Sequence, residues 1–251
     1  MAKLIVLGSS SAIPDEEHEN THLVVTSQNR VVLIDCGNNP TLRLSKVGIS
    51  LDRLTDIILT HFHPDHVSSF PILMMHMWLL GRKEPLIIHG LDHTLDRIKR
   101  MMTCFDWESW RDLFPVRFHI LAENQMACVL ESDELKIYSS PVNHLIPTIG
   151  LRIENLSSHK VVVYSCDTAP CPSVVDLARR ANILIHEAAG EASGHTSASQ
   201  AGEIATQAGV ENLYLIHYNG DNQNVQTLVE QARRKFSEPV ELAKDFMEIP
   251  F

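Results

Sequence analysis

Residues 59–69 read LTHFHPDHVSS, so a short apolar run ends in three histidines and one aspartate. In the HFH part, alternate side chains can point the same way, and the proline that follows restricts the backbone of the loop. His61 and His63 could therefore meet at one metal ion, while Asp65 and His66 face a second. Imidazole and carboxylate are ligands that zinc and similar divalent ions prefer. The alternative is a polar loop whose histidines cap the following helix.

Short β-branched runs with turn residues between them occur along the whole chain and predict strands. The first several follow one another without long helices, which favours antiparallel or mixed sheet over a purely parallel one. The 251 residues fit one large α/β domain, and no linker or repeat divides them. Helices are expected at about 40–47, 66–80, 91–103, 172–181, 197–208 and 222–236.

Several predicted strands end in an ionisable residue. A rigid sheet can present such side chains at one common edge. Each of them alone could be a capping or turn residue, but the repetition favours a shared site. The residues are Asp35, His61, Asp167, His186 and His217.

The chain has 21 Lys and Arg against 31 Asp and Glu, a formal net charge of −10. Nonspecific nucleic-acid affinity depends on clustered cations, so a surface built to neutralise many phosphates is not expected. Five cysteines without CxxC spacing indicate neither a disulfide framework nor a thiolate zinc site, and a reducing cytoplasm is the simplest setting. No apolar stretch approaches the roughly 20 residues of a membrane span, so no membrane association is expected.

HFHPDH resembles the HxHxDH signature of the metallo-β-lactamase superfamily, and LIDCG at 33–37 is similar to that family's first motif. The order of later motifs also agrees, in PVNHLIP, YSCDT and LYLIHY, so the resemblance spans nearly the whole chain. It implies an α/β (α+β) fold, a four-layer αβ/βα sandwich of two mixed β-sheets flanked by helices. It also implies a single domain over 1–251, with a Met/Trp-rich helical segment at about 66–112.

The same resemblance implies two divalent metal ions, zinc first, with manganese or iron as alternatives. Asp35 resembles the carboxylate that orients a ligand histidine, although it could instead close a turn before Gly37. The implied ligands are His61, His63 and His144 for one ion, Asp65, His66 and His217 for the second, and Asp167 as the bridge.

Two divalent ions about 3.5–4 Å apart can share a bridging water, lower its pKa and clamp the oxygens of an electrophile. A metal-bridging hydroxide is then the expected nucleophile, and no serine or cysteine nucleophile is required. Asp65 is counted among the expected catalytic residues as well as among the ligands.

Residues 181–218 closely resemble the C-terminal part of ribonuclease Z, the transfer-RNA 3′-end processing nuclease, whose HEAT loop and GHST helix start precede the last ligand histidine. LGSSSAIP at 7–14 is similar to that family's N-terminal LGTGSGVP. The resemblance implies that His195 donates a hydrogen bond or proton to a phosphoryl oxygen, with Glu187 holding it in place. Without the resemblance, His195 would be interpreted as a solvent-facing residue at a helix start.

The long ribonuclease Z enzymes carry a basic arm between the third-motif histidine and the bridging aspartate. Here residues 144 and 167 lie only 23 positions apart, so no arm fits, and HEAT is HEAA at 186–189. Together with the acidic net charge, these departures favour a small or nucleotide-like phosphodiester over RNA. The armless relatives include cyclic-ribose and cyclic-nucleotide phosphodiesterases.

Three alternatives remain: a lactone, ester or thioester hydrolase on the same metal site, a transfer-RNA 3′-processing endoribonuclease proper, and a noncatalytic binding protein. A homodimer that completes the active-site wall is expected from the family. The Met- and Trp-rich segment favours buried helix packing; alternatively, Trp78, Trp107 and Trp110 shape a pocket in an apolar lid or dimer surface.

Overall fold

The computed structural model describes residues 2–220 and 225–251, which fold into two β-sheets of seven strands each. The first sheet has the order β14-β1-β2-β3-β4-β5-β6. Neighbouring strands from β14 to β3 are antiparallel, and those from β3 to β6 are parallel, so the predicted mixed sheet is confirmed. Its strands are β1 (Lys3–Gly8), β2 (His22–Thr26), β3 (Val31–Ile34), β4 (Asp56–Ile58), β5 (Leu86–Gly90), β6 (Val116–Ile120) and β14 (Glu248–Pro250).

The second sheet has the order β13-β12-β11-β10-β9-β8-β7 and is also mixed. Neighbours from β7 to β10 are antiparallel, and those from β10 to β13 are parallel. The chain therefore repeats one pattern twice, with an antiparallel part followed by a parallel part. The strands are β7 (Ala127–Glu131), β8 (Leu135–Val142), β9 (Thr148–Asn155), β10 (Val161–Tyr164), β11 (Ile183–Glu187), β12 (Asn212–Ile216) and β13 (Val240–Leu242).

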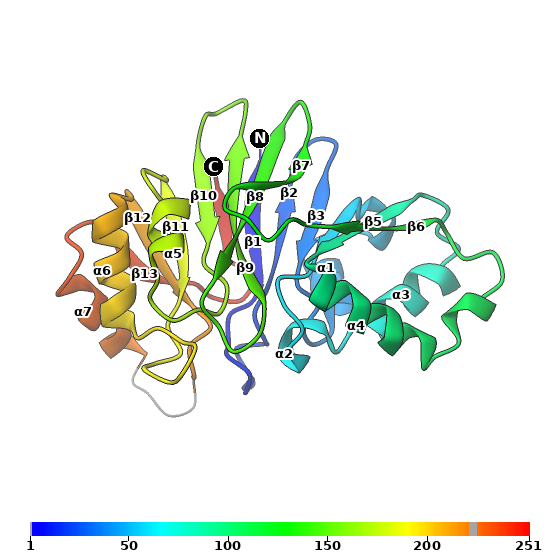
Figure 1. The fold of residues 1–251 in the computed structure, drawn as a ribbon, viewed down its shortest axis with the longest axis horizontal. Helices are drawn as coiled ribbons and strands as arrows, with labels where there is room; N and C mark the ends of the chain where they lie inside the picture. The colour runs from blue at the N-terminus through cyan, green and yellow to red at the C-terminus, as the bar shows by residue number, and fades with distance from the viewer. Residues whose placement is uncertain (1, 221–224) are drawn as a thin grey trace.

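Helices cover the outer face of each sheet, which gives the expected four layers (Figure 1). The expected helix at 66–80 is two helices, because Pro71 lacks the N–H needed to continue a preceding helix and instead stands in the first turn of the second. Of the expected 222–236, residues 222–224 lie outside the described part. The helices are α1 (Pro40–Lys46), α2 (Pro64–Val67), α3 (Phe70–Leu79) and α4 (Asp92–Thr103) on the first sheet, and α5 (Pro172–Leu177), α6 (Ala198–Ala208) and α7 (Gln226–Arg233) on the second.

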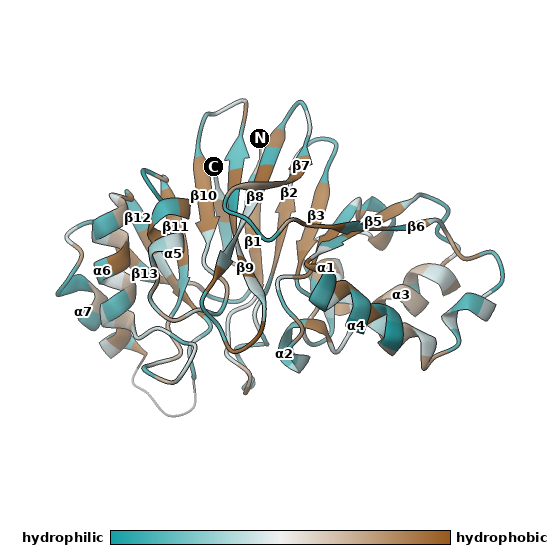
Figure 2. Ribbon diagram, in the orientation of Figure 1, coloured by the Kyte–Doolittle hydropathy of each residue, from teal (hydrophilic) through white to brown (hydrophobic). Residues whose placement is uncertain are grey.

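The main core lies between the two sheets, where strand residues of both sheets meet. All four residues of β3 are buried: Val32 and Ile34 face the other sheet, while Val31 and Leu33 face the helices. A strand that is covered on both faces is apolar throughout rather than alternating, as the brown strands of Figure 2 show. Among the described residues, no helix is long and apolar enough to cross a membrane.

A buried polar chain crosses the parallel part of the first sheet. Asp56 is fully buried and accepts a hydrogen bond from Nε2 of His89 at 2.9 Å, while Arg30 lies 3.3 Å from its other oxygen. Nδ1 of His89 lies 3.0 Å from Nδ1 of His119 on the edge strand. Burial raises the pKa of Asp56, but the hydrogen bonds from His89 and Thr55 and the nearby charges outweigh burial, so its pKa is below the ordinary value.

Asp56→Asn is expected to lower the free energy of unfolding at pH 7 by about 1–3 kcal/mol, because the charge-assisted bond to His89 is lost. A carboxylate whose pKa is lowered by folding stabilises the protein above its unfolded-state pKa of about 3.9, and this contribution disappears as the pH falls through the folded-state pKa. Urea unfolding at several pH values should show the wild-type advantage shrinking toward acid.

The matched control is Glu248→Gln, which removes an exposed ion pair with Lys3 and should change stability little. An advantage of wild type over Asp56→Asn that stays constant down to the acid limit would contradict this account.

Candidate metal centre

The predicted site residues lie at one end of the sandwich, just beyond the ends of parallel strands. Asp35 follows β3 and His61 follows β4, two neighbouring strands of the first sheet. Asp167 follows β10 and His217 follows β12, on either side of β11 in the second sheet. Because parallel strands end at the same edge, each sheet delivers its polar residues to one place, and the two places face each other.

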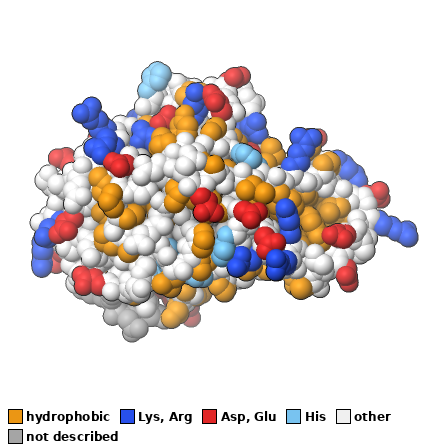
Figure 3. All heavy atoms as spheres, viewed as in Figure 1, with side chains coloured by type: hydrophobic (Ala, Val, Ile, Leu, Met, Phe, Trp, Pro, Cys, Tyr) orange, Lys and Arg blue, Asp and Glu red, His pale blue; other side chains and the backbone are white. Residues whose placement is uncertain are grey.

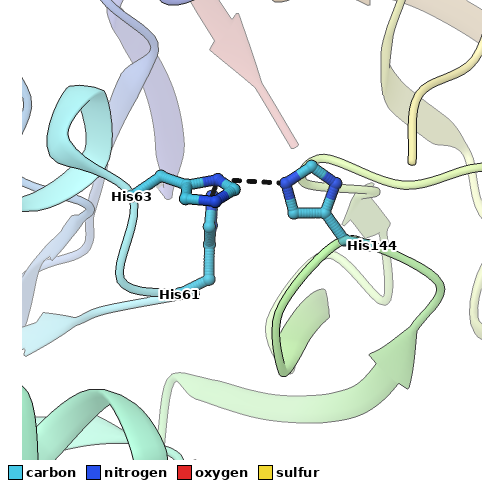
Figure 4. A group of neighbouring side chains, drawn as sticks. All are labelled: His61, His63 and His144. Carbon is cyan, nitrogen blue, oxygen red and sulfur yellow. Dashed lines mark hydrogen bonds between the residues drawn. The ribbon is translucent and has the colours of Figure 1, made fainter. Parts of the chain in front are cut away.

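Three imidazoles form a first cluster. Nδ1 of His63 lies 3.1 Å from Nε2 of His61 and 3.1 Å from Nε2 of His144 (Figure 4). These nitrogens belong to side chains from opposite sheets, and they lie close enough together to hold one metal ion. Burial lowers the pKa of all three histidines, that of His61 furthest, so the neutral form that binds metals is favoured.

A second cluster contains Asp65, His66, Asp167 and His217, which also lie close enough to hold an ion. Nε2 of His66 is 3.4 Å from Asp65 and 3.5 Å from Asp167, and Nε2 of His217 is 3.2 Å from Asp167. The carboxylate of Asp167 also lies 3.9 Å from Nε2 of His61 and 4.0 Å from that of His144. Asp167 therefore stands between the two clusters.

Two atoms of the second cluster test whether a metal ion fits there. Nε2 of His66 and Oδ1 of Asp167 are buried and have no hydrogen-bond partner in the described part of the chain. Leaving buried polar atoms unpaired is costly, and native proteins rarely do so without a ligand or ion at that place. Both atoms are of the types that bind zinc and related divalent ions. The residues present thus fit a metal centre.

The charges within the second cluster compensate one another. Burial raises the pKa of Asp167, but His217 and His66 outweigh burial and hold that pKa well below its ordinary value. Burial lowers the pKa of His66, but Asp167 and Asp35 outweigh burial and raise it well above its ordinary value. The ionised carboxylate, which is the form that binds metal ions, is therefore the stable form of Asp167.

Asp35 lies behind the two clusters rather than within them. Its carboxylate is fully buried and accepts a hydrogen bond from Nδ1 of His66 at 2.8 Å. The same carboxylate accepts hydrogen bonds from the backbone N–H and the hydroxyl of Thr60. Its backbone has a positive φ of 63°, a conformation that Asp and Asn adopt more readily than bulkier residues. The contact to His66 matches the orienting position that the resemblance implies.

His195 lies beside both clusters and is held by Glu187. Its Nδ1 is 2.9 Å from Oε1 of Glu187, and its ring centre lies 5.0 Å from that of His144 and 5.9 Å from that of His217. Glu187 is fully buried and also accepts hydrogen bonds from backbone N–H groups of Thr168 and Ala189. The hydrogen bond from His195 to Glu187 raises the pKa of His195 despite partial burial. His195 can thus carry a proton toward the centre.

The loop before His195 also supports the first cluster. The carbonyl of Gly194 accepts a hydrogen bond from Nδ1 of His144 at 2.7 Å, which leaves Nε2 directed at the cluster. Gly194 has a φ of 81°, and a Cβ there would approach Nδ1 of His144 to 2.9 Å, so glycine is required. The capping box of Ser197 and Gln200 fixes the start of α6 directly after this loop.

Several supporting residues were not predicted from the sequence. Thr60 contacts both Asp35 and His61, and Thr21 lies 3.2 Å from Nδ1 of His217. Thr60 directly precedes the candidate ligand His61, so its position in the sequence could have indicated a supporting role. Thr21 is 196 positions from its partner His217, and nothing in the local sequence indicates their contact. His186, which was expected at a strand end, lies within β11 and belongs to neither cluster.

The Met/Trp-rich segment forms part of the helical layer. Phe70, Leu73, Met74 and Met77 of α3 are buried against the first sheet, as the packing interpretation expects. In the alternative interpretation Trp107 would shape a pocket with Trp78 and Trp110, but it packs against the ring of Phe118 and is not among the residues that line the pocket. The pocket has a volume of about 400 Å³ and is lined by Ser68, Pro71, Ile72, Met75, Trp78, Phe105 and Trp110.

Comparisons with known proteins agree with this architecture. The family model for anti-Pycsar protein Apyc1 matches residues 2–242. A ribonuclease Z of Methanothermobacter thermautotrophicus is 30% identical over 306 aligned positions, covering 99% of this chain and 96% of the relative. The ribonuclease Z match confirms the expected ribonuclease Z-like branch.

Two solved structures confirm the fold. The metallo-β-lactamase fold protein YhfI of Bacillus subtilis superposes with a TM-score of 0.82 at 22% identity, covering 99% of this chain and 98% of that one. The short form of human tRNase Z superposes with a TM-score of 0.79 at 23% identity, covering 100% and 99%. The chain therefore belongs to the anti-Pycsar protein Apyc1 family and is a ribonuclease Z-like hydrolase of the metallo-β-lactamase fold.

Proposed function

We propose that the protein is a dinuclear metal-dependent phosphodiesterase that hydrolyses a small, nucleotide-like phosphodiester. The observation that carries this proposal is the His195–Glu187 pair beside a cluster of imidazoles and carboxylates that could hold two divalent ions. A water-activating centre alone serves many hydrolases, but a held imidazole at its side supplies a proton donor suited to a phosphoryl oxygen. The ribonuclease Z relatives support the same reaction class.

The proposed ligands are the seven side chains of the two clusters. When bound, two divalent ions supply acidification of water and neutralisation of charge on phosphoryl oxygens. Zinc is the first choice, because nitrogen and carboxylate donors at short range suit it, and manganese or iron are alternatives. The proposed sets are His61, His63 and His144, then Asp65, His66 and His217, with Asp167 shared by both.

The protein's own groups position and move protons. Glu187 accepts the Nδ1 proton of His195, so Nε2 is free to donate to a phosphoryl or leaving-group oxygen. The raised pKa of His195 favours the imidazolium form, which carries the Nε2 proton to be donated. Asp65 is half-buried beside His66 and is proposed to accept a proton from water as well as to bind metal.

The loops around the centre favour a substrate with little charge. None of the loop segments that carry the site residues contains lysine or arginine, so only imidazoles and bound ions could neutralise phosphate there. Between His144 and Asp167 the chain forms only β9, β10 and their connections, which leaves no arm to grip RNA. On the face in Figure 3, basic and acidic side chains are interspersed. The segments are 8–21, 35–39, 60–69, 143–148, 165–173, 187–197 and 217–220.

A hydrolysis panel after metal loading tests this proposal. We expect turnover of bis-p-nitrophenyl phosphate and of cyclic mononucleotides, slower cleavage of a precursor transfer RNA, and loss of all turnover with a chelator or in Asp167→Ala. An acyl-lactone and a thioester complete the panel. Turnover of the lactone or thioester without any phosphodiester would overturn the proposal, and preferred cleavage of the precursor transfer RNA would instead assign the endoribonuclease function.

His195→Ala is expected to lower kcat about 10²–10⁴-fold on a cyclic nucleotide, whose alkoxide leaving group needs a proton. The loss should be much smaller on bis-p-nitrophenyl phosphate, because p-nitrophenolate leaves without protonation. Glu187→Gln should show the same dependence on leaving group with a smaller loss, since it only positions His195. Equal losses on both substrates would mean that His195 does not act as the proton donor.

We also propose that the protein forms a homodimer through the outer faces of α1 and α3. These helices are joined by a contact of 2.8 Å between Thr41 and His76. Large exposed apolar side chains on neighbouring helices are typical of a protein–protein interface, and two identical surfaces can pair about a two-fold axis. Its large apolar side chains are Leu42 of α1, Ile72 and Leu79 of α3, and Leu80 directly after α3, with 64%, 41%, 64% and 70% exposure. Phe105, which is 55% exposed, lines the neighbouring pocket together with Ile72.

Analytical ultracentrifugation of the wild type should therefore give a dimer, and Leu79→Glu with Leu80→Glu should give a monomer, because two buried charges would be unpaired. Ile120→Glu, at an exposed apolar residue on β6, is the matched control and should stay dimeric. A wild type that sediments as a monomer at all concentrations would rule the dimer out.

A further inference from the structure

Thr60 stands between the buried carboxylate of Asp35 and the ring of His61. We propose that Thr60 is a positioning residue of the metal centre. Its hydroxyl links the carboxylate of Asp35 to His61 of the first cluster. One carboxylate would then orient one imidazole on each side: His66 directly, and His61 through Thr60. This inference rests on the proposed metal ligands but not on the substrate or reaction.

The carboxylate of Asp35 accepts hydrogen bonds from two residues, Thr60 and His66, which lie on opposite sides of the proposed metal centre. Oδ1 accepts from the backbone N–H of Thr60 at 2.8 Å, and Oδ2 accepts from Nδ1 of His66 at 2.8 Å. The Thr60 hydroxyl lies 2.9 Å and 2.8 Å from the two oxygens. Each oxygen of Asp35 already accepts a hydrogen bond from a nitrogen donor, so the Thr60 hydroxyl takes the donor role toward this carboxylate.

The direction of that hydrogen bond decides the state of His61. A hydroxyl has one proton and two lone pairs, and the proton is already committed to Asp35. Nδ1 of His61, 3.1 Å from the Thr60 oxygen, must therefore donate to it. The second lone pair accepts from the thiol of Cys166, whose sulfur lies 3.0 Å away. Every hydrogen-bonding position of this buried hydroxyl is thus filled.

The consequence is a fixed tautomer for His61. With the proton on Nδ1, the lone pair of Nε2 is directed at the nitrogens of His63 and His144. For His66, the hydrogen bond from Nδ1 to Asp35 fixes the orientation of the ring and directs Nε2 toward Asp167. A neutral imidazole binds a metal through the nitrogen without a proton, so the Thr60 hydroxyl prepares His61 to bind an ion through Nε2.

Measuring the affinity of each zinc-binding step separately distinguishes this positioning role of Thr60 from a purely structural role. Thr60→Val keeps the shape but removes the hydroxyl, and we expect one of the two zinc-binding steps to weaken about 10–100-fold while the other is unchanged. Thr60→Ser should bind both ions as the wild type does, and Asp35→Asn should weaken both steps. The measurement is competition with a chromophoric chelator. Thr60→Val with both affinities intact, or with both lowered, would overturn the inference.

A second measurement needs no variant. Long-range ¹H–¹⁵N correlation spectra of the metal-free wild type report which imidazole nitrogen of each histidine carries the proton, and His61 should have its proton on Nδ1. A proton on Nε2 of His61 would overturn the inference. A protein that binds two zinc ions with this tautomer but cleaves no phosphodiester would contradict the proposed function and leave the role of Thr60 standing.

Discussion

The carboxylate of Asp167 lies buried between the ends of two β-sheets, and the rest of the site follows from this one charge. A buried carboxylate is costly unless cations and hydrogen bonds surround it. Here His66 and His217 face it directly, and His61 and His144 stand within 4.0 Å of its oxygens. One of its oxygens still lacks a hydrogen-bond partner among the described residues, as expected of an atom that binds an ion.

The two-sheet architecture is what makes this arrangement possible. The first sheet supplies the histidine-rich loop after β4, and the second supplies the residues after β8, β10 and β12, so neither sheet alone holds all the candidate ligands. A rigid core between the sheets fixes the distance between the two halves. Contacts behind the ligands, such as Asp35 to His66 and Gly194 to His144, then fix the direction of each ring.

The sequence predicts the local parts of this structure better than the distant ones. The loop at 61–66 carries its own ligand spacing, and the β-branched runs predict most strands, so both halves of the site and the mixed sheets could be foreseen. Thr21 could not, because its partner His217 is 196 positions away and no motif joins them. Trp107 does not line the pocket, because its ring packs edge-to-face against Phe118 of β6. No local sequence pattern indicates this contact.

We propose that the two sheets close around two metal ions. Anomalous difference maps, from crystals grown with zinc and recorded on both sides of the zinc absorption edge, test it most directly. We expect two peaks about 3.5–4 Å apart, one against His61, His63 and His144 and the other against Asp65, His66 and His217, with Asp167 in contact with both. A single peak, or zinc bound without Asp167, would contradict it.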